Sequence, residues 1–412
     1  MADNVVARKN GDWNSISILP DVCKTPMGGT LLPVPYPVTS NLAPSVGTTG
    51  SVKANSDTVV AFDKTKMPKT EGDAPGTGKG VKSGTVGKDT WPQDKSSTVK
   101  AEDKKVVRND DKTEMNGDFA SKEEEEKAKR QKCRQEQAEA GKQSADPKVR
   151  AAADRFSRDI KSAEHARLAE HVYNPSNPAP TGWNNISNDP AALSRYGLTQ
   201  NELNIPGTNF RAQVYEPNSA VFGDTMRPAV VFQGTSGTGD WGANIRQGLN
   251  MESAYYQRAV GIGNVLHATN SNVDIVGHSL GGGLASATSQ AGGFPATTFN
   301  AAGLHSRTVP GYGVVRGNPR MVNAYRVDNE ILTSSQEGGW KSSLVAAAMG
   351  PVTALTHAFG TWMAPDGIGN KFALPGSGTP LARHGMDQVI RGIEGEKTQD
   401  QQTIAKDTGK EC

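Results

Sequence analysis

The hydrophobic and polar positions give the second half of the chain an alternation of short apolar runs and segments of small residues. The apolar runs predict buried strands, at Pro228–Phe232, Val273–Val276, Ala296–Asn300 and Arg320–Val327. The segments beside the second run predict helices, at Ser253–Ala268 and Leu280–Gln290. The run at Val273–Val276 is therefore expected to form a strand that passes through a sharp turn into a helix.

The first 118 or so residues have a different pattern. Six prolines between positions 20 and 44, together with many glycines, exclude long helices and favour short strands joined by tight turns. The pattern Val-Lys-Ala-x-x-x-x-Val-Val-x-x-Asp begins at Val52 and recurs 47 residues later at Val99. This repeat predicts one β-unit that is used twice.

Two further segments stand out by their charge. Residues 121–140 are dense in charged helix formers with almost no apolar stripe, which predicts a solvated helix or a flexible spacer, whereas Ala151–Val172 is amphipathic and is expected to pack on the following domain. From Ser342 to Pro365 there is no charged residue. Gly350-Pro351 and Gly360 interrupt this stretch, so it is expected to be either a buried helical hairpin or a lipid-contacting wall rather than a membrane span.

Composition fits a modular protein of two or three domains. The 412 residues contain 35% hydrophobic residues, below the value of about 45–50% for globular domains. A net charge of +2 does not give the excess of positive charge that is typical of nucleic-acid-binding proteins. The three widely separated cysteines, Cys23, Cys133 and Cys412, predict synthesis in a reducing compartment without structural disulfides. The N-terminus has no apolar core of signal-peptide length.

The strongest chemical signal is the pattern Gly277-His-Ser279-Leu-Gly281 directly after the Val273–Val276 strand. A serine on a sharp strand-to-helix turn sits in strained geometry that exposes its hydroxyl, and the glycines are needed because a Cβ would clash where strand and helix pass. Ser279 is therefore the candidate nucleophile. The alternative is a glycine-rich turn whose serine only caps the helix.

A serine nucleophile needs a base and an acid that orients it, expected in the order Ser, Asp, His. Asp328 follows the Arg320–Val327 strand and is the predicted acid, with Glu330 as the nearest rival. His384 lies in a loop before a predicted last helix at Met386–Ile393 and is the predicted base. His357 lies in an apolar segment and is expected to be a packed core or lining residue. His278, beside the nucleophile, is expected either to form a wall of the site or to contact the site residues from behind.

Acyl transfer also requires donors for the oxygen that becomes negative in the tetrahedral intermediate. The backbone N–H of Leu280 is one predicted donor because it follows the nucleophile. Thr235, in the Gln233-Gly-Thr235 exit of the Pro228–Phe232 strand, is the second. A plain strand-ending turn is the alternative for this second motif.

The Val-Val-Phe-Gln-Gly-Thr strand exit and the Gly-His-Ser-Leu-Gly-Gly turn resemble the class 3, or fungal-type, lipases of the α/β-hydrolase superfamily. Gln233 stands where those lipases commonly have arginine. The resemblance covers mainly Arg211–Ile393. It implies a mostly parallel sheet with flanking helices, a triad of Ser279, Asp328 and His384, no cofactor, and a lid over about 237–250.

The first domain resembles the PAAR-like domains that cap the spike of type VI secretion machines, most closely at Asp21–Pro26, Pro33–Pro37 and Gly80–Gly87. The resemblance implies a small, turn-rich β-cone that docks on the trimeric spike protein and carries a fused toxin into another cell. Zinc-bearing members use histidines, but this chain has none before His165, so no metal of that kind is expected. A generic β-rich accessory domain is the alternative.

Together these patterns predict a multi-domain protein: a PAAR-like domain at 1–118, a charged helical linker at 119–150 and an α/β-hydrolase at 151–412. The expected function is an antibacterial type VI effector that hydrolyses membrane phospholipids through an acyl-enzyme. It would be made in the bacterial cytoplasm, act at the periplasm or membrane of the target cell, and be neutralised in its producer by an immunity protein. A neutral-lipid or small-ester hydrolase and a non-catalytic spike-capping or lipid-binding protein are the alternatives.

Overall fold

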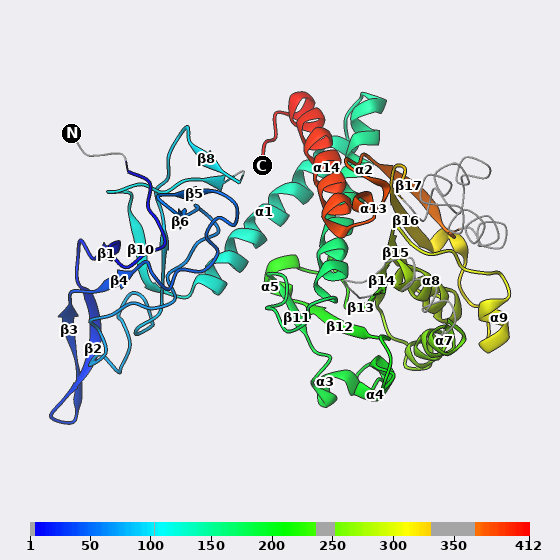
Figure 1. Cartoon of the computed structure of the whole chain (residues 1–412), viewed down its shortest axis with the longest axis horizontal. Coiled ribbons are helices and arrows are strands. Elements are labelled where there is room, and N and C mark those ends of the chain that lie inside the picture. The colour runs from blue at the N-terminus through cyan, green and yellow to red at the C-terminus, as the bar shows by residue number, and fades with distance from the viewer. Residues whose placement is uncertain (1–4, 103, 236–251, 331–366) are drawn as a thin grey trace. The chain divides into compact units, whose positions relative to one another are not determined.

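The computed structural model describes residues 5–102, 104–235, 252–330 and 367–412 (Figure 1). The chain forms two compact units, Met1–Glu124 and Glu125–Cys412. The predicted lid over 237–250, the uncharged segment 342–365 and His357 lie outside the described residues. Among the helices of these described ranges, none combines the length and the hydropathy that a membrane span needs.

The N-terminal unit is built from short antiparallel strand pairs, as the density of proline and glycine predicts. The pairs are β1 (Asn14–Ile16) with β4 (Thr39–Asn41), β2 (Asp21–Met27) with β3 (Thr30–Tyr36), β5 (Lys53–Ala54) with β6 (Asp57–Thr58), β7 (Asp89–Pro92) with β10 (Thr113–Gly117), and β8 (Lys100–Ala101) with β9 (Lys104–Lys105). Two small apolar clusters fill the unit.

The predicted repeat is confirmed as a repeated hairpin. The pairs β5–β6 and β8–β9 have the same length, and the aspartates that end the two repeats, Asp63 and Asp110, both have a positive φ, 57° and 67°. Val60 and Val107 share one apolar cluster of the unit. One β-unit is therefore used twice, with equivalent residues in the same core.

The C-terminal unit contains a seven-stranded sheet in the order β11-β12-β13-β14-β15-β16-β17. Its strands are β11 (Trp183–Asn185), β12 (Ala212–Pro217), β13 (Ala229–Phe232), β14 (Asp274–His278), β15 (Ala296–Phe299), β16 (Val322–Val327) and β17 (Asn370–Leu374). The first two junctions are antiparallel and the other four are parallel. The predicted, mostly parallel sheet is confirmed.

Helices cover both faces of this sheet. Successive residues of a strand point to opposite faces, and in β13 Val230 belongs to a cluster with α7 (Glu252–Ala268) and α8 (Leu280–Gly292). Its neighbour Val231 belongs to a second cluster, with α2 (Pro147–His171) and α14 (Met386–Thr408). The shorter helices are α3 (Pro190–Ser194), α4 (Gln200–Leu203), α5 (Ser219–Phe222), α9 (Thr308–Tyr312), α13 (Pro380–Arg383) and the 3-10 turn η1 (Pro319–Met321).

The charged segment expected to be a solvated helix or a flexible spacer is a helix, as one of these alternatives has it, but it packs on other helices. It forms α1 (Phe119–Lys142), and from Glu125 onward this helix belongs to the C-terminal unit. Lys127 Nζ lies 2.6 Å from Glu164 Oε2 of α2, and Ala138 packs in a buried cluster with Ile404 of α14. A buried ion pair and small residues take the place of the apolar stripe that the sequence lacks.

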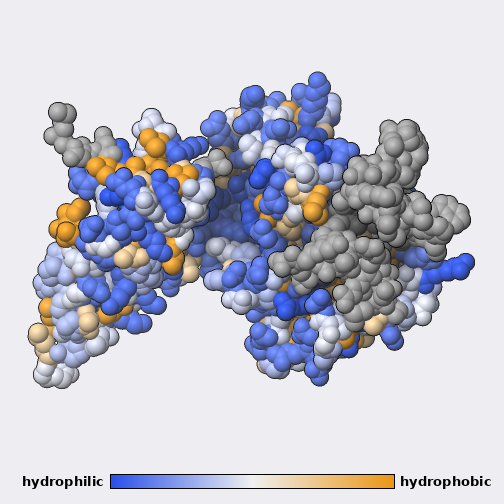
Figure 2. All heavy atoms as spheres, viewed as in Figure 1, coloured by the Kyte–Doolittle hydropathy of each residue, from blue (hydrophilic) through white to orange (hydrophobic). Residues whose placement is uncertain are grey.

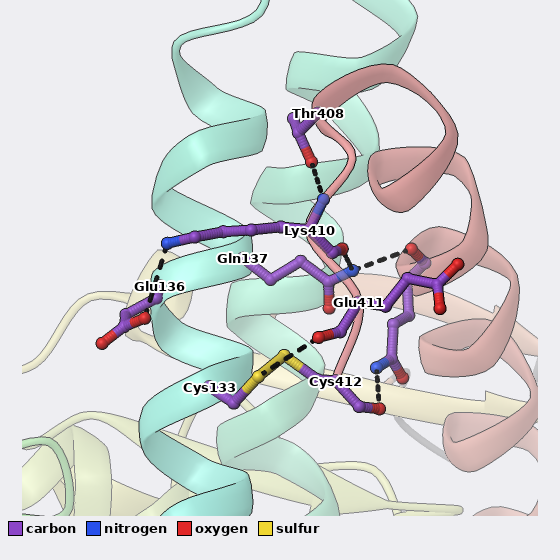
Figure 3. The surroundings of a disulfide bond; sticks show 8 residues. Cys133, Glu136, Gln137, Thr408, Lys410, Glu411 and Cys412 are labelled. Atoms are coloured by element: carbon purple, nitrogen blue, oxygen red, sulfur yellow. Dashed lines mark hydrogen bonds and ion pairs between the residues drawn. A yellow bond between two sulfur atoms is a disulfide. The ribbon is translucent and has the colours of Figure 1, made fainter.

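The prediction of no structural disulfide is wrong. Cys133 of α1 is bonded to Cys412, which follows α14, and the two are 279 residues apart in the sequence (Figure 3). Gln137 donates hydrogen bonds to the carbonyl oxygens of Gln401 and Lys410 at the same place. Spacing alone could not indicate this pair, because only the packing of α1 against α14 brings the two cysteines together.

We expect Cys412→Ser to lower the free energy of unfolding by about 2–4 kcal/mol, because the bond closes a long loop in the unfolded chain. Thermal unfolding with and without reductant measures this effect. Reductant should lower the melting temperature of the wild type and leave that of the variant unchanged. Titration of the denatured, unreduced chain should find only the thiol of Cys23; three reactive thiols would contradict the pairing.

Candidate active site

The turn between β14 and α8 holds Ser279 in a backbone conformation that side-chain-bearing residues rarely adopt. Its φ is 58° and its ψ is −128°. A Cβ added at Gly277 would lie 2.0 Å from the carbonyl oxygen of Gly281, and one added at Gly281 would lie 2.3 Å from that of Phe232. The predicted strand, strained turn and helix are confirmed, and so is the need for both glycines.

The second component is a buried pair of His384 and Glu330. His384 follows α13 and is 4% exposed, and its Nδ1 lies 2.7 Å from Oε2 of Glu330, which is fully buried. A carboxylate at this distance favours the tautomer in which Nδ1 carries the hydrogen. Nε2 is then the nitrogen that can accept a proton.

Asp328 makes no such contact with His384. The carboxylate that the structure places at the imidazole is that of Glu330, the rival of Asp328 in the sequence. Asp328 is exposed, and its backbone N–H donates to the carbonyl oxygen of Leu374 at 2.9 Å. The chain then turns through Asn329, whose φ is 56°, and Glu330 N–H donates to the carbonyl oxygen of Val327. This turn brings the side chain two residues further on, not the first one, to the imidazole.

The loop of His384 is held against the nucleophile turn by its carbonyl oxygen. His278 Nε2 lies 2.8 Å from that oxygen, and the His278 and His384 rings are 4.8 Å apart between centroids. Because His278 directly precedes Ser279, these contacts bring the loop of the predicted base next to the turn of the predicted nucleophile.

The exit of β13 borders the nucleophile on another side. A Cβ added at Gly234 would lie 3.1 Å from Cβ of Ser279 and 2.6 Å from the carbonyl oxygen of His278. Thr235 follows and is partly exposed. Leu280 is the first residue of α8, where backbone N–H groups have no acceptor within the helix. Both predicted oxyanion donors therefore lie in segments that flank Ser279.

Comparisons with known proteins find relatives of both units. Residues 164–379, just over half of the chain, match the Tle-like phospholipase domain. The chain belongs to this phospholipase family. Residues 14–121 match the toxin PAAR-like domain. Extracellular phospholipase A1 of Serratia liquefaciens is 27% identical over 254 residues, which cover 56% of this chain and 70% of that protein. The predicted architecture of a PAAR-like domain joined to a lipase-like hydrolase is confirmed.

Sequence reasoning missed two residues of the phospholipase domain that contact this site. Asn300, at the exit of β15, donates from Nδ2 to the carbonyl oxygen of His384 at 3.0 Å and accepts from Val327 N–H at 2.9 Å. Its place at the carboxyl end of the strand beside β14 is a signal that could have been used. Tyr173, just after α2, has its hydroxyl in hydrogen bonds with His278 Nδ1 and with the N–H of Gly234. No sequence motif marks this residue.

One group of potential metal ligands exists among the described residues, in the N-terminal unit. The ligand atoms of Asp21, Cys23 and Asp73 lie within 4.8 Å of one another. Asn116 Nδ2 donates to both carboxylates, and burial, followed by the charge of Asp21, raises the pKa of the Cys23 thiol to about 11. These contacts give the three groups partners within the protein, and the expectation of no histidine-type zinc site stays a prediction.

Proposed function

We propose that the C-terminal unit cleaves acyl ester bonds of membrane phospholipids with Ser279 as the nucleophile, His384 as the base and Glu330 as the orienting acid. The observation that carries this proposal is the strained Ser279 turn beside the buried His384–Glu330 pair. The membership of the phospholipase family supports the substrate class. The name of the Serratia relative favours cleavage at the sn-1 position.

In the proposed reaction, His384 Nε2 takes the proton of the Ser279 hydroxyl as its oxygen attacks the acyl carbonyl. The backbone N–H groups of Leu280 and Thr235 stabilise the oxyanion. Collapse of the intermediate transfers the proton from His384 to the lysophospholipid oxygen, which leaves. Water, deprotonated by the same imidazole, then attacks the acyl-enzyme. Collapse of the second intermediate releases the fatty acid, and the imidazole returns the proton to the Ser279 oxygen.

The N-terminal unit is proposed to dock on the trimeric spike protein of a type VI secretion system. The match to the toxin PAAR-like domain supports this role. Figure 2 shows hydrophobic residues at several places on the surface of this unit. The most exposed large hydrophobic side chains of the described residues lie here, at Ile16, Ile18 and Leu19, which are 71%, 83% and 79% exposed. We further propose that the protein is delivered into competing bacteria and that an immunity protein neutralises it in the producer.

The test is mass spectrometry of lipids after the full chain is incubated with vesicles of phosphatidylethanolamine and phosphatidylglycerol that carry different acyl chains at sn-1 and sn-2. We expect release of the sn-1 fatty acid and the matching lysophospholipid. Release of the sn-2 chain would change the assigned position. Hydrolysis of triacylglycerol or short esters alone would favour the neutral-lipid or small-ester alternative, and no hydrolysis of any ester by the folded protein would overturn the enzyme proposal.

A further inference from the structure

A chain of hydrogen bonds connects the exit of β13 to the loop of His384. Gly234 N–H donates to the Tyr173 hydroxyl at 3.1 Å, and that hydroxyl lies 2.8 Å from His278 Nδ1. On its other side, His278 Nε2 lies 2.8 Å from the carbonyl oxygen of His384. Four segments far apart in the sequence are thereby joined through two side chains that belong to no predicted triad.

The chemistry of the partners fixes the direction of each bond. A carbonyl oxygen can only accept, so His278 Nε2 must carry a hydrogen. Burial, followed by the nearby His384, lowers the pKa of His278 to about 3, so the ring is neutral and its Nδ1 is an acceptor. The Tyr173 hydroxyl must then donate to Nδ1 while it accepts from Gly234. Burial raises the pKa of Tyr173, which keeps this hydroxyl protonated.

The hydrogen bond of Gly234 also limits which N–H groups can serve as oxyanion donors. Gly234 lies against Ser279, but its N–H is already used by Tyr173. The next N–H along the strand exit is that of Thr235, the predicted donor. The hydrogen bond from Gly234 to Tyr173 thus restrains the position of the β13 exit relative to Ser279. The hydrogen bond from His278 restrains the backbone of His384.

We propose that Tyr173 and His278 are positioning residues that hold the oxyanion segment and the His384 loop at a set separation across Ser279, a role that rests on the function proposed above. A misplacement of about 1 Å in such a site can cost about 100-fold in rate. Loss of the hydrogen bonds made by Tyr173 and His278 should therefore lower the rate of acylation more than it lowers substrate binding.

The chain contains a matched control. The Tyr215 hydroxyl lies 2.8 Å from His171 Nδ1, and His171 Nε2 lies 3.0 Å from the carbonyl oxygen of Asn177. This is the same tyrosine–histidine–carbonyl pattern, but Tyr215 is on β12, which is separated from β14 by β13. Tyr215→Phe removes an equivalent hydroxyl outside the proposed site.

We expect Tyr173→Phe to lower kcat by about 10–100-fold with KM within about two-fold, and Tyr215→Phe to leave kcat within about two-fold. Thermal melting of both variants shows whether stability is affected equally. Equal effects of the two variants on kcat, or a Tyr173→Phe loss confined to KM, would overturn the positioning role of Tyr173.

His278 is tested by the pair His278→Gln and His278→Leu. The amide N–H of glutamine can donate to the His384 carbonyl oxygen, and leucine cannot, so glutamine should retain at least about ten-fold more kcat. Equal losses would overturn this role for His278. The rate of Ser279 labelling by an alkyl phosphonate is measured in parallel. If variants of Tyr173 and His278 are labelled slowly while the wild type is labelled fast and is active, the proposal is supported. If the wild type is neither labelled nor hydrolyses lipid, the proposed function fails, and this role fails with it.

Discussion

Replacement of Glu330 by glutamine is expected to lower kcat by about 10³–10⁴-fold, the effect typical of removing the charge of an orienting carboxylate. Glu330 is fully buried and its carboxylate lies 2.7 Å from His384 Nδ1. A glutamine amide can donate to Nδ1 and favour the tautomer that carries its hydrogen on Nε2. That tautomer cannot accept the proton of Ser279.

Asp328→Asn is the control for this prediction because it makes the same chemical change two residues away on an exposed side chain. We expect kcat within about two-fold of the wild type, since exposed substitutions away from special contacts have small effects. Initial rates on phospholipid vesicles, with circular dichroism to confirm folding, provide the measurement. A larger loss for Asp328→Asn than for Glu330→Gln would restore Asp328 as the acid and contradict the assignment to Glu330.

The choice between the two acids illustrates what the sequence could and could not predict. Both residues follow the same strand, and strand periodicity places that strand correctly. Which carboxylate reaches His384 depends on the left-handed backbone of Asn329, whose φ is 56°. Asparagine adopts this conformation more readily than most residues, but one such residue in a sequence does not reveal the direction in which the next side chain points.

The nucleophile turn was predictable because its pattern is local. A Cβ at Gly277 would meet the backbone of Gly281 within the same five residues, whereas one at Gly281 would meet the carbonyl oxygen of Phe232 on β13, yet both glycines belong to one short motif. The repeated hairpin of the N-terminal unit was predictable for a similar reason, since each copy pairs with itself.

Tyr173 and the Cys133–Cys412 bond were not predictable on this basis. Tyr173 meets His278 across 105 residues of sequence, and the two cysteines meet across 279. Such contacts result from the packing of whole helices on the sheet. Neither the spacing nor the residue types of the partners distinguish them from other buried pairs.

Substitution of Ser279 by alanine is expected to lower kcat by about 10⁵–10⁶-fold, because the nucleophile, its base and the orienting acid act as one unit. The turn itself should persist, since Gly277 and Gly281 remain and the backbone N–H of residue 279 still donates to the carbonyl oxygen of Phe299 at 3.0 Å. Ser286→Ala is the matched control and should retain activity, because Ser286 is a buried serine on α8, the helix that follows the turn.

The same pair of variants separates an enzyme from a spike-capping or lipid-binding protein. We expect Ser279→Ala to abolish killing of target cells and lysophospholipid release while secretion from the producer continues, because the N-terminal unit Met1–Glu124 is a separate compact unit that the substitution does not touch. Ser286→Ala should kill and secrete like the wild type. Killing that survives in Ser279→Ala would mean that toxicity does not depend on the acyl-enzyme, and the proposed mechanism would fail even if the purified wild type hydrolysed phospholipid.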